Sequence, residues 1–443
     1  MKSLFDLVVV GAGPGGTVAA KTAAKNGLEV ALLERKTNLS VVRRACTACL
    51  GIKDEFFGDV QFFDDKTKRL LFPRNGFSIK YDGPTHNVYG FHLTSPNGTK
   101  VRIGDVNEAK KIGNDARVAV MVHKGQLIQG LVDECKARGV NIYLNTNVVD
   151  IWNEPDGVVV ADHRGNRYKG KFVIAADGVN SRIMRRLGIN RERRWLGTYK
   201  DRALEMEGVE FDEMDALIFC MGWNTSISLA PSIHEGWYHV SAASYNWRDD
   251  LEKGLQEYMQ SPAYASWFKK ARVVEGHGSA CVSNIYSSIL VPYKDNVLIV
   301  GDAGWMQECS IGGAMMMGNK AAYAVVYAIN NKQTNKQGIA SYLDWWTKYL
   351  IGPYGAGGGF GADLKDYINA DDLNYLASLV DKPLRATLDF YTVYRSIGRT
   401  YAALFPRISE ERPDIMQKFM AMRGVHPEDG LAKRRKNGFL SLS

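Results

Sequence analysis

The stretch Gly11-Ala12-Gly13-Pro14-Gly15-Gly16 decides how this chain begins to fold. It matches the pattern G-x-G-x-x-G and follows an apolar run at residues 7–10, which predicts a buried parallel strand. The alanine-rich residues 17–26 predict the helix that comes next. In such a turn the first glycine makes the bend, the second lets the backbone approach a pyrophosphate, and the third lets helix and strand pack closely. The stretch therefore predicts a dinucleotide-binding unit whose helix N-terminus faces a diphosphate.

An acidic residue supports this interpretation. Residues 29–34 predict a second strand that ends at Glu34, about twenty residues after the glycines. A carboxylate at that place suits a ribose 2′-hydroxyl and would repel a 2′-phosphate. Arg35 follows it and is assigned to the same nucleotide site. We therefore predict these cofactor-binding residues: Gly11, Gly13, Pro14, Gly15, Gly16, Glu34 and Arg35.

Length and composition exclude several classes of protein. A chain of 443 residues indicates two or three structural units, and 45% apolar with 23% charged residues is ordinary for a globular protein. No run reaches the roughly 18 apolar residues of a membrane span, and no signal peptide is visible, so we expect a cytoplasmic protein. Six cysteines do not make a disulfide framework. Cys46-x-x-Cys49 lacks the second pair of a zinc site, so no metal is expected.

The remaining patterns predict an α/β fold with three parts. Residues 118–138 predict a helix, and short apolar runs predict strands at 141–144, 148–152, 158–161, 172–176 and 296–300. Alternation over 203–245 predicts a separate antiparallel sheet. A long helix is expected near Gly313, and a helical region from about residue 340 is broken by a glycine-rich loop at 355–361. We predict a Rossmann-type cofactor domain at 1–75, 104–190 and 278–340, an antiparallel substrate domain at 76–103 and 191–277, and a helical C-terminal region at 341–443.

Two later blocks carry a resemblance. The first is Ala175-Ala176-Asp177-Gly178-Val179-Asn180-Ser181-Arg182, and the second is Val297-Leu298-Ile299-Val300-Gly301-Asp302-Ala303-Gly304. With the glycine stretch, they resemble FAD-dependent enzymes of the p-hydroxybenzoate hydroxylase fold. The resemblance implies that FAD is the cofactor, that Asp302 binds its ribityl chain, and that the helix starting at Ile311-Gly312-Gly313-Ala314 lies beside the flavin pyrimidine. It adds these residues to the FAD site: Asp177, Gly178, Gly301, Asp302, Gly312, Gly313 and Ala314.

Within that fold, the chain is similar to the geranylgeranyl reductase family over roughly residues 5 to 330. The family has a Cys-Gly-Gly-Gly-Leu-like block where this chain has Cys46-Thr47-Ala48-Cys49-Leu50. Its aromatic substrate motif is echoed at residues 236–240, without the terminal Phe-Pro. The resemblance implies reduction of carbon–carbon double bonds in an apolar, prenyl-like or lipid-like substrate, by hydride transfer from reduced FAD. No nicotinamide site is visible, so an external donor such as a ferredoxin is expected, and no nucleic-acid partner is expected.

The two cysteines are the candidate catalytic residues. The resemblance implies that Cys46 donates a proton beside the flavin or gates the active site. Water could supply the proton instead, and a cysteine is also often simply a small buried residue. Cys46 and Cys49 together could instead relay electrons, although disulfide reductases space their cysteines by four residues and carry a second glycine loop. Two further alternatives are a flavin monooxygenase that hydroxylates an aromatic substrate and a non-catalytic FAD-binding electron carrier.

Other side chains of the predicted substrate sheet are weaker candidates. A lone histidine is more often structural, so none of the four histidines stands out. Most of the aromatic residues are expected in the core, but together they would also suit an apolar or planar substrate pocket. The histidines are His92, His234, His239 and His277, and the aromatic residues are Trp223, Trp237, Tyr238, Tyr245 and Trp247.

Positive charge is concentrated in one run. Residues 182–202 carry eight Lys/Arg and two acids, against a net charge of +8 for the whole chain. A charge run is usually a solvated face. Here it could also dock an acidic electron donor or a membrane surface, and we expect it to emerge near the surface of the FAD domain.

Overall fold

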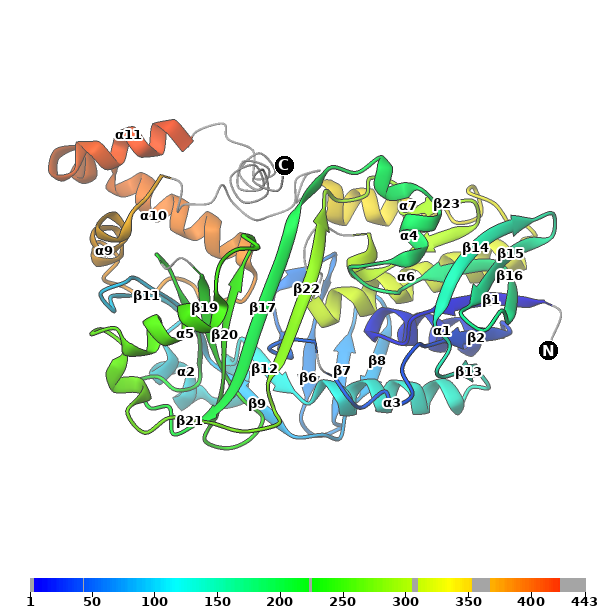
Figure 1. Cartoon of the computed structure of the whole chain (residues 1–443), viewed down its shortest axis with the longest axis horizontal. Coiled ribbons are helices and arrows are strands. Elements are labelled where there is room, and N and C mark those ends of the chain that lie inside the picture. The colour runs from blue at the N-terminus through cyan, green and yellow to red at the C-terminus, as the bar shows by residue number, and fades with distance from the viewer. Residues whose placement is uncertain (1–3, 43, 223–224, 305–309, 353–366, 423–443) are drawn as a thin grey trace.

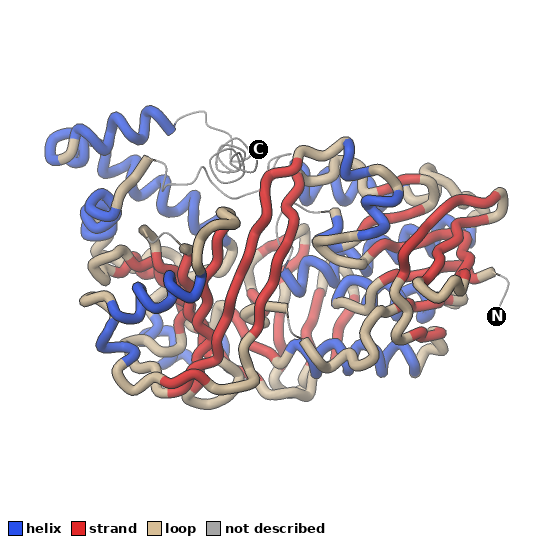
Figure 2. Tube along the Cα trace, viewed as in Figure 1, coloured by secondary structure: helices blue, strands red, loops and turns tan. Residues whose placement is uncertain are grey.

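The computed structural model describes residues 4–42, 44–222, 225–304, 310–352 and 367–422. Two eight-stranded sheets lie side by side along the long axis of the molecule, each with its own helices (Figures 1 and 2). The predicted fold class is confirmed: a parallel Rossmann-like sheet, a second and mostly antiparallel sheet, and helices toward the C-terminus. The glycine-rich segment 355–361 and Trp223 lie outside the described residues.

The first sheet has β1 (Phe5–Val10) near its centre. β1 pairs in parallel with β2 (Val30–Leu33) on one side and with β16 (Arg167–Ala175) on the other, and β24 (Val297–Ile299) pairs in parallel with β16. The outer strands are β13 (Asn141–Tyr143), β14 (Val148–Glu154), β15 (Gly157–Asp162) and β23 (Tyr293–Lys294). Because β1 is buried on both faces, its run of apolar residues does not alternate with polar ones.

Three helices pack with this sheet. They are α1 (Pro14–Lys25), α3 (Lys124–Lys136) and α6 (Ser310–Asn330). α1 and α6 approach so closely that a Cβ on Gly318 would lie 2.0 Å from the carbonyl oxygen of Gly15. The glycines thus bring the start of α6 next to the start of α1, where the nucleotide motif lies.

The second sheet is built around a long strand. β17 (Trp195–Glu207) pairs with β20 (Trp237–Ser244) and β22 (Ser279–Tyr286), and the β17–β22 pair runs between the two halves of the molecule (Figure 1). β10 (Gly90–Thr94) pairs with β18 (Ala216–Cys220) in parallel, the exception in this sheet. The helix α5 (Leu251–Gln260) packs through Leu255 and Tyr258 on the face of the sheet that holds Leu204 and Val240. The other strands are β10 (Gly90–Thr94), β11 (Lys100–Ile103), β18 (Ala216–Cys220), β19 (Ser226–Pro231) and β21 (Arg272–Val273).

The predicted helix at 118–138 is wrong at its start. Residues 119–122 form a strand, β12 (Ala119–Val122), which pairs with β3 (Cys49–Gly51) and β9 (Thr85–Val88). The run is apolar and rich in β-branched residues, and it is buried throughout, as in a central strand. The helix begins only at Lys124, after Nδ1 of His123 accepts a hydrogen bond from the Gln126 backbone N–H at 3.1 Å.

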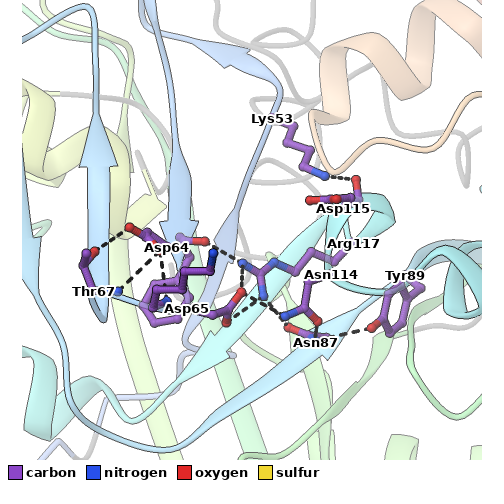
Figure 3. Close-up of polar contacts among 11 residues, drawn as sticks. Lys53, Asp64, Asp65, Thr67, Asn87, Tyr89, Asn114, Asp115 and Arg117 are labelled. Carbon is purple, nitrogen blue, oxygen red and sulfur yellow. Dashed lines mark hydrogen bonds and ion pairs between the residues drawn. The ribbon is translucent and has the colours of Figure 1, made fainter.

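A buried arginine ties this small sheet to its neighbour, which contains β6 (Phe62–Asp64), β7 (Arg69–Phe72) and β8 (Phe77–Lys80). Arg117 is 4% exposed and donates to the Phe63 carbonyl at 2.6 Å and to Asn87 at 3.1 Å, while it pairs with Asp65 (Figure 3). Such a network satisfies a buried charge and fixes the two strands that it joins. The part of the chain between β3 and β12 also contains β4 (Glu55–Phe56), β5 (Asp59–Val60) and α2 (Val106–Ile112).

The described C-terminal helices are α7 (Ala340–Trp346), α9 (Ala370–Ser378), α10 (Phe390–Glu411) and α11 (Pro413–Met422). In α9, Asp372 accepts from Arg412 at 2.6 Å and from Lys418 at 2.5 Å, which joins it to α11 and the residue before it. In the described part of the chain, no helix combines the length and apolarity needed to cross a membrane. The domain boundaries given above stay predictions.

Candidate functional site

The glycines of the first motif differ in what surrounds them. A Cβ on Gly11 would lie 2.3 Å from the Ala176 carbonyl oxygen, and Gly11 has a φ of +102°. A Cβ on Gly16 would lie 1.9 Å from the carbonyl oxygen of Gly11, whereas a Cβ on Gly13 would have no atom within 4 Å. Gly11 and Gly16 therefore serve packing inside the protein. Gly13 faces open space at the N-terminus of α1, where a ligand can approach the backbone.

One pocket brings the three sequence blocks together. It has a volume of about 120 Å³ and lies where β1, β16 and β24 end. Because these are neighbouring parallel strands, their carboxyl ends meet at one edge, which is the usual ligand site of such sheets. The lining residues are Gly13, Pro14, Gly15, Arg44, Lys124, Ala176, Gly178, Val300, Gly301, Asp302, Ser310, Ile311 and Ala314.

Glu34 lies against the glycine loop. It is 7% exposed, and its carboxylate accepts from the Ala12 backbone N–H at 2.8 Å and from the Lys36 backbone N–H at 2.9 Å. Burial lowers the pKa of the Lys36 ammonium, against the attraction of Glu34. Arg35 is exposed beside it. The carboxylate thus holds the loop as well as lying at the end of β2, where a ribose is expected.

The two aspartates of the later blocks lie in different surroundings. Asp177 accepts from the Ser181 hydroxyl at 2.6 Å and from the Arg182 backbone N–H at 2.8 Å, so it holds the start of α4 (Arg182–Arg186) and does not line the pocket. Burial raises the pKa of its carboxyl, although these hydrogen bonds oppose the shift. Asp302 lines the pocket and accepts from Nη1 of Arg44 at 2.9 Å.

The start of α6 packs on the segment before β6. A Cβ on Gly312 would lie 1.9 Å from Gln61, and one on Gly313 would lie 2.8 Å from Phe57. Ala314 lines the pocket itself. The glycines therefore let the first turn of α6 approach both the pocket and this segment.

Sequence reasoning missed two basic residues. Arg44 comes from the segment before Cys46, and Lys124 starts α3, far along the chain. Both line the pocket, where cations suit a diphosphate. Arg44 had a signal, because it lies two residues before Cys46 of the cysteine block, but Lys124 fell inside the helix predicted from residue 118.

A second, larger cavity adjoins this pocket and shares Arg44 and Lys124 with it. Its volume is about 650 Å³, and it lies between the second eight-stranded sheet and the segments that follow β2 and β12. On one side it is lined by the segments 40–46 and 122–125. On the other it is lined by the ends of β17, β20 and β22 and the loops before the last two. The charged and histidine side chains that line it are Arg44, His123, Lys124, Arg202, Glu205, His234, His239 and His277.

The two cysteines are placed differently. Cys46 lines the larger cavity, and the Ala48 backbone N–H donates to its Sγ at 3.4 Å. Ala48 has a φ of +53°, the left-handed conformation that favours glycine, so the turn keeps a glycine-like shape. Cys49 is in β3, does not line the cavity, and packs in the cluster around Val88 and Met121. Burial raises the pKa of its thiol to about 12.

The aromatic residues do not form the expected apolar pocket. Tyr238 is buried in the core behind the sheet, Tyr245 packs on Tyr199, and Trp247 is 52% exposed. Trp237 packs on His234 and His277, with ring centroids 4.6 Å and 5.2 Å away. His92 is fully buried 3.3 Å from Glu213, and that burial lowers its pKa. None of these aromatic residues, nor His92, lines the larger cavity, whose lining combines polar side chains with aliphatic ones such as Val41, Val42 and Ile233.

The basic run is not one surface. Arg193 points inward, where it donates to the carbonyls of Ser287 at 2.5 Å and Ala303 at 3.1 Å, and burial lowers its pKa to about 10. Arg182 donates to the Val148 carbonyl of β14, and Arg202 reaches the larger cavity. The expectation that the whole run emerges on the surface is therefore wrong for Arg193.

Comparison with known proteins gives two matching family models. A model described as a pyridine nucleotide-disulphide oxidoreductase matches residues 5–82. A model described as an FAD binding domain matches residues 79–305, just over half of the chain.

Similar proteins include archaeal enzymes named digeranylgeranylglycerophospholipid reductase 2. That of Methanosphaera stadtmanae is 26% identical over 86% of this chain and 89% of its own length. That of Methanococcoides burtonii is 29% identical, over 43% of this chain and 41% of its own length, so this match spans less than half of that relative. A solved geranylgeranyl bacteriochlorophyll reductase-like protein of Thermoplasma acidophilum has a TM-score of 0.71 at 19% identity. This structural match covers 95% of this chain and 99% of that one, and it shows a shared fold.

Proposed function

The chain belongs to the FAD-binding domain family, and on that premise we propose that it reduces carbon–carbon double bonds of a prenyl-like substrate. It is an FAD-dependent oxidoreductase of the geranylgeranyl reductase-like kind. The names of the relatives support a lipid substrate, because they are reductases of a geranylgeranyl phospholipid. That the substrate of this chain is a prenyl-like lipid, and that its carbon–carbon double bonds are reduced, is our proposal.

The residues of the smaller pocket fit FAD. The open face of Gly13 and the free N–H groups at the start of α1 suit the pyrophosphate, and Arg44 and Lys124 add positive charge beside it. Glu34 suits the ribose, and Asp302 suits the ribityl chain. When bound, FAD supplies the hydride of the reduction.

The presence of Cys46 in the larger cavity is the observation that carries the proposal. Reduction of a double bond needs a proton as well as a hydride. Cys46 lines a cavity that adjoins the cofactor pocket, and the Ala48 backbone N–H donates to its sulfur. We assign the Sγ–H of Cys46 as the proton donor. Cys49 has no access to that cavity, and its raised pKa keeps the thiol protonated. This arrangement supports a single acid in preference to a dithiol relay.

Electrons must reach the flavin from outside. We propose an acidic protein of the ferredoxin type as donor, docking on exposed basic residues near the FAD domain. Arg185 and Arg191 are exposed, in α4 and at the end of the turn that follows it. Contact of the same residues with an anionic membrane that carries the lipid substrate is the rival arrangement.

Paired cysteine variants test the proton donor. Cys46→Ser should slow reduction of a geranylgeranyl lipid by dithionite-reduced enzyme about 100-fold or more, the range for loss of a general acid. Cys49→Ser is the matched control and should change the rate little. Both should retain FAD, and mass spectrometry should show two hydrogens added per reduced bond.

Three outcomes would contradict the proposal. Equal and large losses in both variants would favour a dithiol relay. A product that gains oxygen would instead identify a monooxygenase. Reoxidation that is independent of substrate would indicate an electron carrier.

A further inference from the structure

The strand β22 separates the larger cavity from the cofactor half of the molecule (Figure 1). It pairs with β17, and its first residues, Ser279 and Ala280, line the larger cavity. Among the described residues β22 has no strand partner on its outer edge. An edge strand presents a row of N–H and C=O groups that need other partners. The groups that bind this outer edge therefore set where the cavity lies relative to the cofactor pocket.

Asn180 takes the place of a neighbouring strand on that edge. Its Nδ2 donates to the Val282 carbonyl at 2.9 Å, and its Oδ1 accepts from the Asn284 backbone N–H at 3.0 Å. A side-chain carboxamide carries a donor and an acceptor, as a peptide group does, so it can satisfy both backbone groups at once. The two hydrogen bonds join parts of the chain that are 102 and 104 residues apart.

The residues before Asn180 connect it to the cofactor pocket. Gly178 lines that pocket, and Val179 packs against the cluster formed by Leu196 of β17 and Ile285 of β22. Three consecutive residues thus face the cofactor pocket, the apolar core beside β22 and the edge of β22. Because no residue of the link lacks a contact, the loop fixes β22 against the wall of the cofactor pocket.

Two other parts of the chain reach the same edge. The backbone N–H of Ala45, at the start of the cysteine block, donates to the Ala280 carbonyl at 3.3 Å. Arg193 donates to the carbonyl of Ser287, just after β22, and to that of Ala303 in the Gly-Asp block. β22 is therefore joined to all three blocks that carry the cofactor residues and the proton donor.

We propose that Asn180 is a positioning residue, which holds the larger cavity in register with the flavin site. Hydride transfer requires reacting atoms that lie about 3–3.5 Å apart, and a misplacement of about 1 Å can cost about 100-fold in rate. Asn180 is exposed, so its replacement weakens the contacts of β22 without opening a core. The inference rests on the proposed function, because it needs a substrate that reacts in the larger cavity.

Asn180→Ala removes both hydrogen bonds and tests the proposal. FAD-loaded enzyme, reduced with stoichiometric dithionite, is mixed with a saturating geranylgeranyl lipid in a stopped-flow instrument. Reoxidation of the flavin by the lipid should slow about tenfold or more. FAD affinity and reoxidation by oxygen should stay as in the wild type, because neither needs the substrate sheet.

Two further variants sharpen the comparison. Asn180→Asp keeps the acceptor but sets a carboxylate oxygen against the Val282 carbonyl, so it should slow the reaction at least as much as Asn180→Ala. Asn331→Ala is the matched control and should react as the wild type does. Asn331 is also exposed and donates to a carbonyl at 2.8 Å, that of Tyr327, but this bond joins only the end of α6.

Wild-type rates in both Asn180 variants would overturn the proposal. So would a slower reaction that comes with an equal loss of FAD affinity, because that result indicates a general structural role. If Cys46→Ser slows the reaction with lipid but Asn180→Ala does not, the proposed function stands and this inference falls. If the wild type itself does not react with lipid, the proposed function fails. Hydrogen exchange of residues 279–286 then decides the inference: it should rise in Asn180→Ala and not in Asn331→Ala, and unchanged exchange would refute it.

Discussion

Two alanine substitutions within one motif should separate ligand binding from packing. In Gly16→Ala the new Cβ would lie 1.9 Å from the carbonyl oxygen of Gly11, so α1 and the loop must separate by more than 1 Å to reach the shortest real contact, 3.0 Å. Overpacking of this kind costs about 1–3 kcal/mol, and here the obstacle is rigid backbone, so we expect about 3 kcal/mol. The apo-protein should therefore lose stability before any ligand is considered.

Gly13→Ala should behave in the opposite way. Gly13 has φ −72° and ψ 179°, an extended conformation that alanine adopts without strain, and the methyl group would meet no protein atom. The apo-protein should keep its stability or gain about 0.4–1 kcal/mol, because alanine restricts the unfolded chain. FAD affinity should fall by about 30-fold or more, the equivalent of 2 kcal/mol, since the methyl group occupies the approach to the backbone N–H groups.

Urea unfolding of the apo-proteins and FAD titration by flavin fluorescence measure the two effects. The wild type is the control for stability, and Gly27→Ala is the control for FAD affinity: Gly27 has φ +85° at the end of α1, so its alanine variant should lose stability through backbone strain but bind FAD normally. If Gly13→Ala were as unstable as Gly16→Ala, the loop would pack differently from the structure. If Gly13→Ala bound FAD normally, this glycine would not face the diphosphate.

Three further predictions test other parts of the molecule. Ala48→Gly should stabilise the protein by about 0.5–1 kcal/mol, because φ is +53° there, and an unchanged urea midpoint would contradict this strain. Arg193→Gln should cost about 2 kcal/mol or more and Arg191→Gln about 0.5 kcal/mol or less, since only the first has buried carbonyl partners; equal midpoints would refute the contrast. The pKa of the Asp372 carboxyl is lowered, because hydrogen bonds from Lys418 and two other donors outweigh the opposing effect of burial. The ionised carboxylate therefore stabilises the protein above about pH 4, and this stabilisation is lost as pH falls further. The protection factors of the amides of residues 413–422, which correct for the slower intrinsic hydrogen exchange in acid, should therefore fall, and an identical acid response in Asp372→Asn would count against this ion pair.

The nucleotide-binding half of the fold was accessible from sequence because its signals are local. A strand buried on both faces, a glycine turn and a small-residue helix follow each other without interruption, and the structure has β1, α1 and β2 within a few residues of the expected bounds. Residues 49–117 gave no comparable pattern, because their strands are only two to five residues long and two of them, β3 and β9, pair with the distant β12. The error at residues 119–122 has the same cause: an apolar run next to a helix is assigned to the helix unless its pairing partners are known.

The site shows the same division between local and distant information. The motif glycines and Asp302 could be named from their blocks, and their assignment to FAD contacts stays a prediction. The His239–Glu205 pair could not be named, because it joins two strands 34 residues apart through their register. Which of the aromatic residues lie in the core and which could face a pocket was not accessible, because composition does not tell which face of a strand a side chain occupies. In β20, Tyr238 lies in the core while its neighbour His239 lines the cavity.

The basic run shows why charge along a sequence is a poor guide to charge on a surface. Its members fall on a helix, a turn and a long strand, so their side chains point in different directions. Arg193 points inward, Arg182 toward β14, and Arg202 into the larger cavity. Docking of an acidic donor therefore depends on fewer residues, with Arg185 and Arg191 exposed near the FAD domain. Reversing these two to Glu should slow electron transfer from a reduced ferredoxin and weaken its dependence on salt, while leaving reduction by dithionite unchanged. Arg248→Glu together with Lys269→Glu is the control, because both residues are exposed and lie in the second half of the molecule. If the Arg185/Arg191 variant accepts electrons normally but no longer sediments with anionic vesicles, these arginines contact a membrane and the donor docks elsewhere.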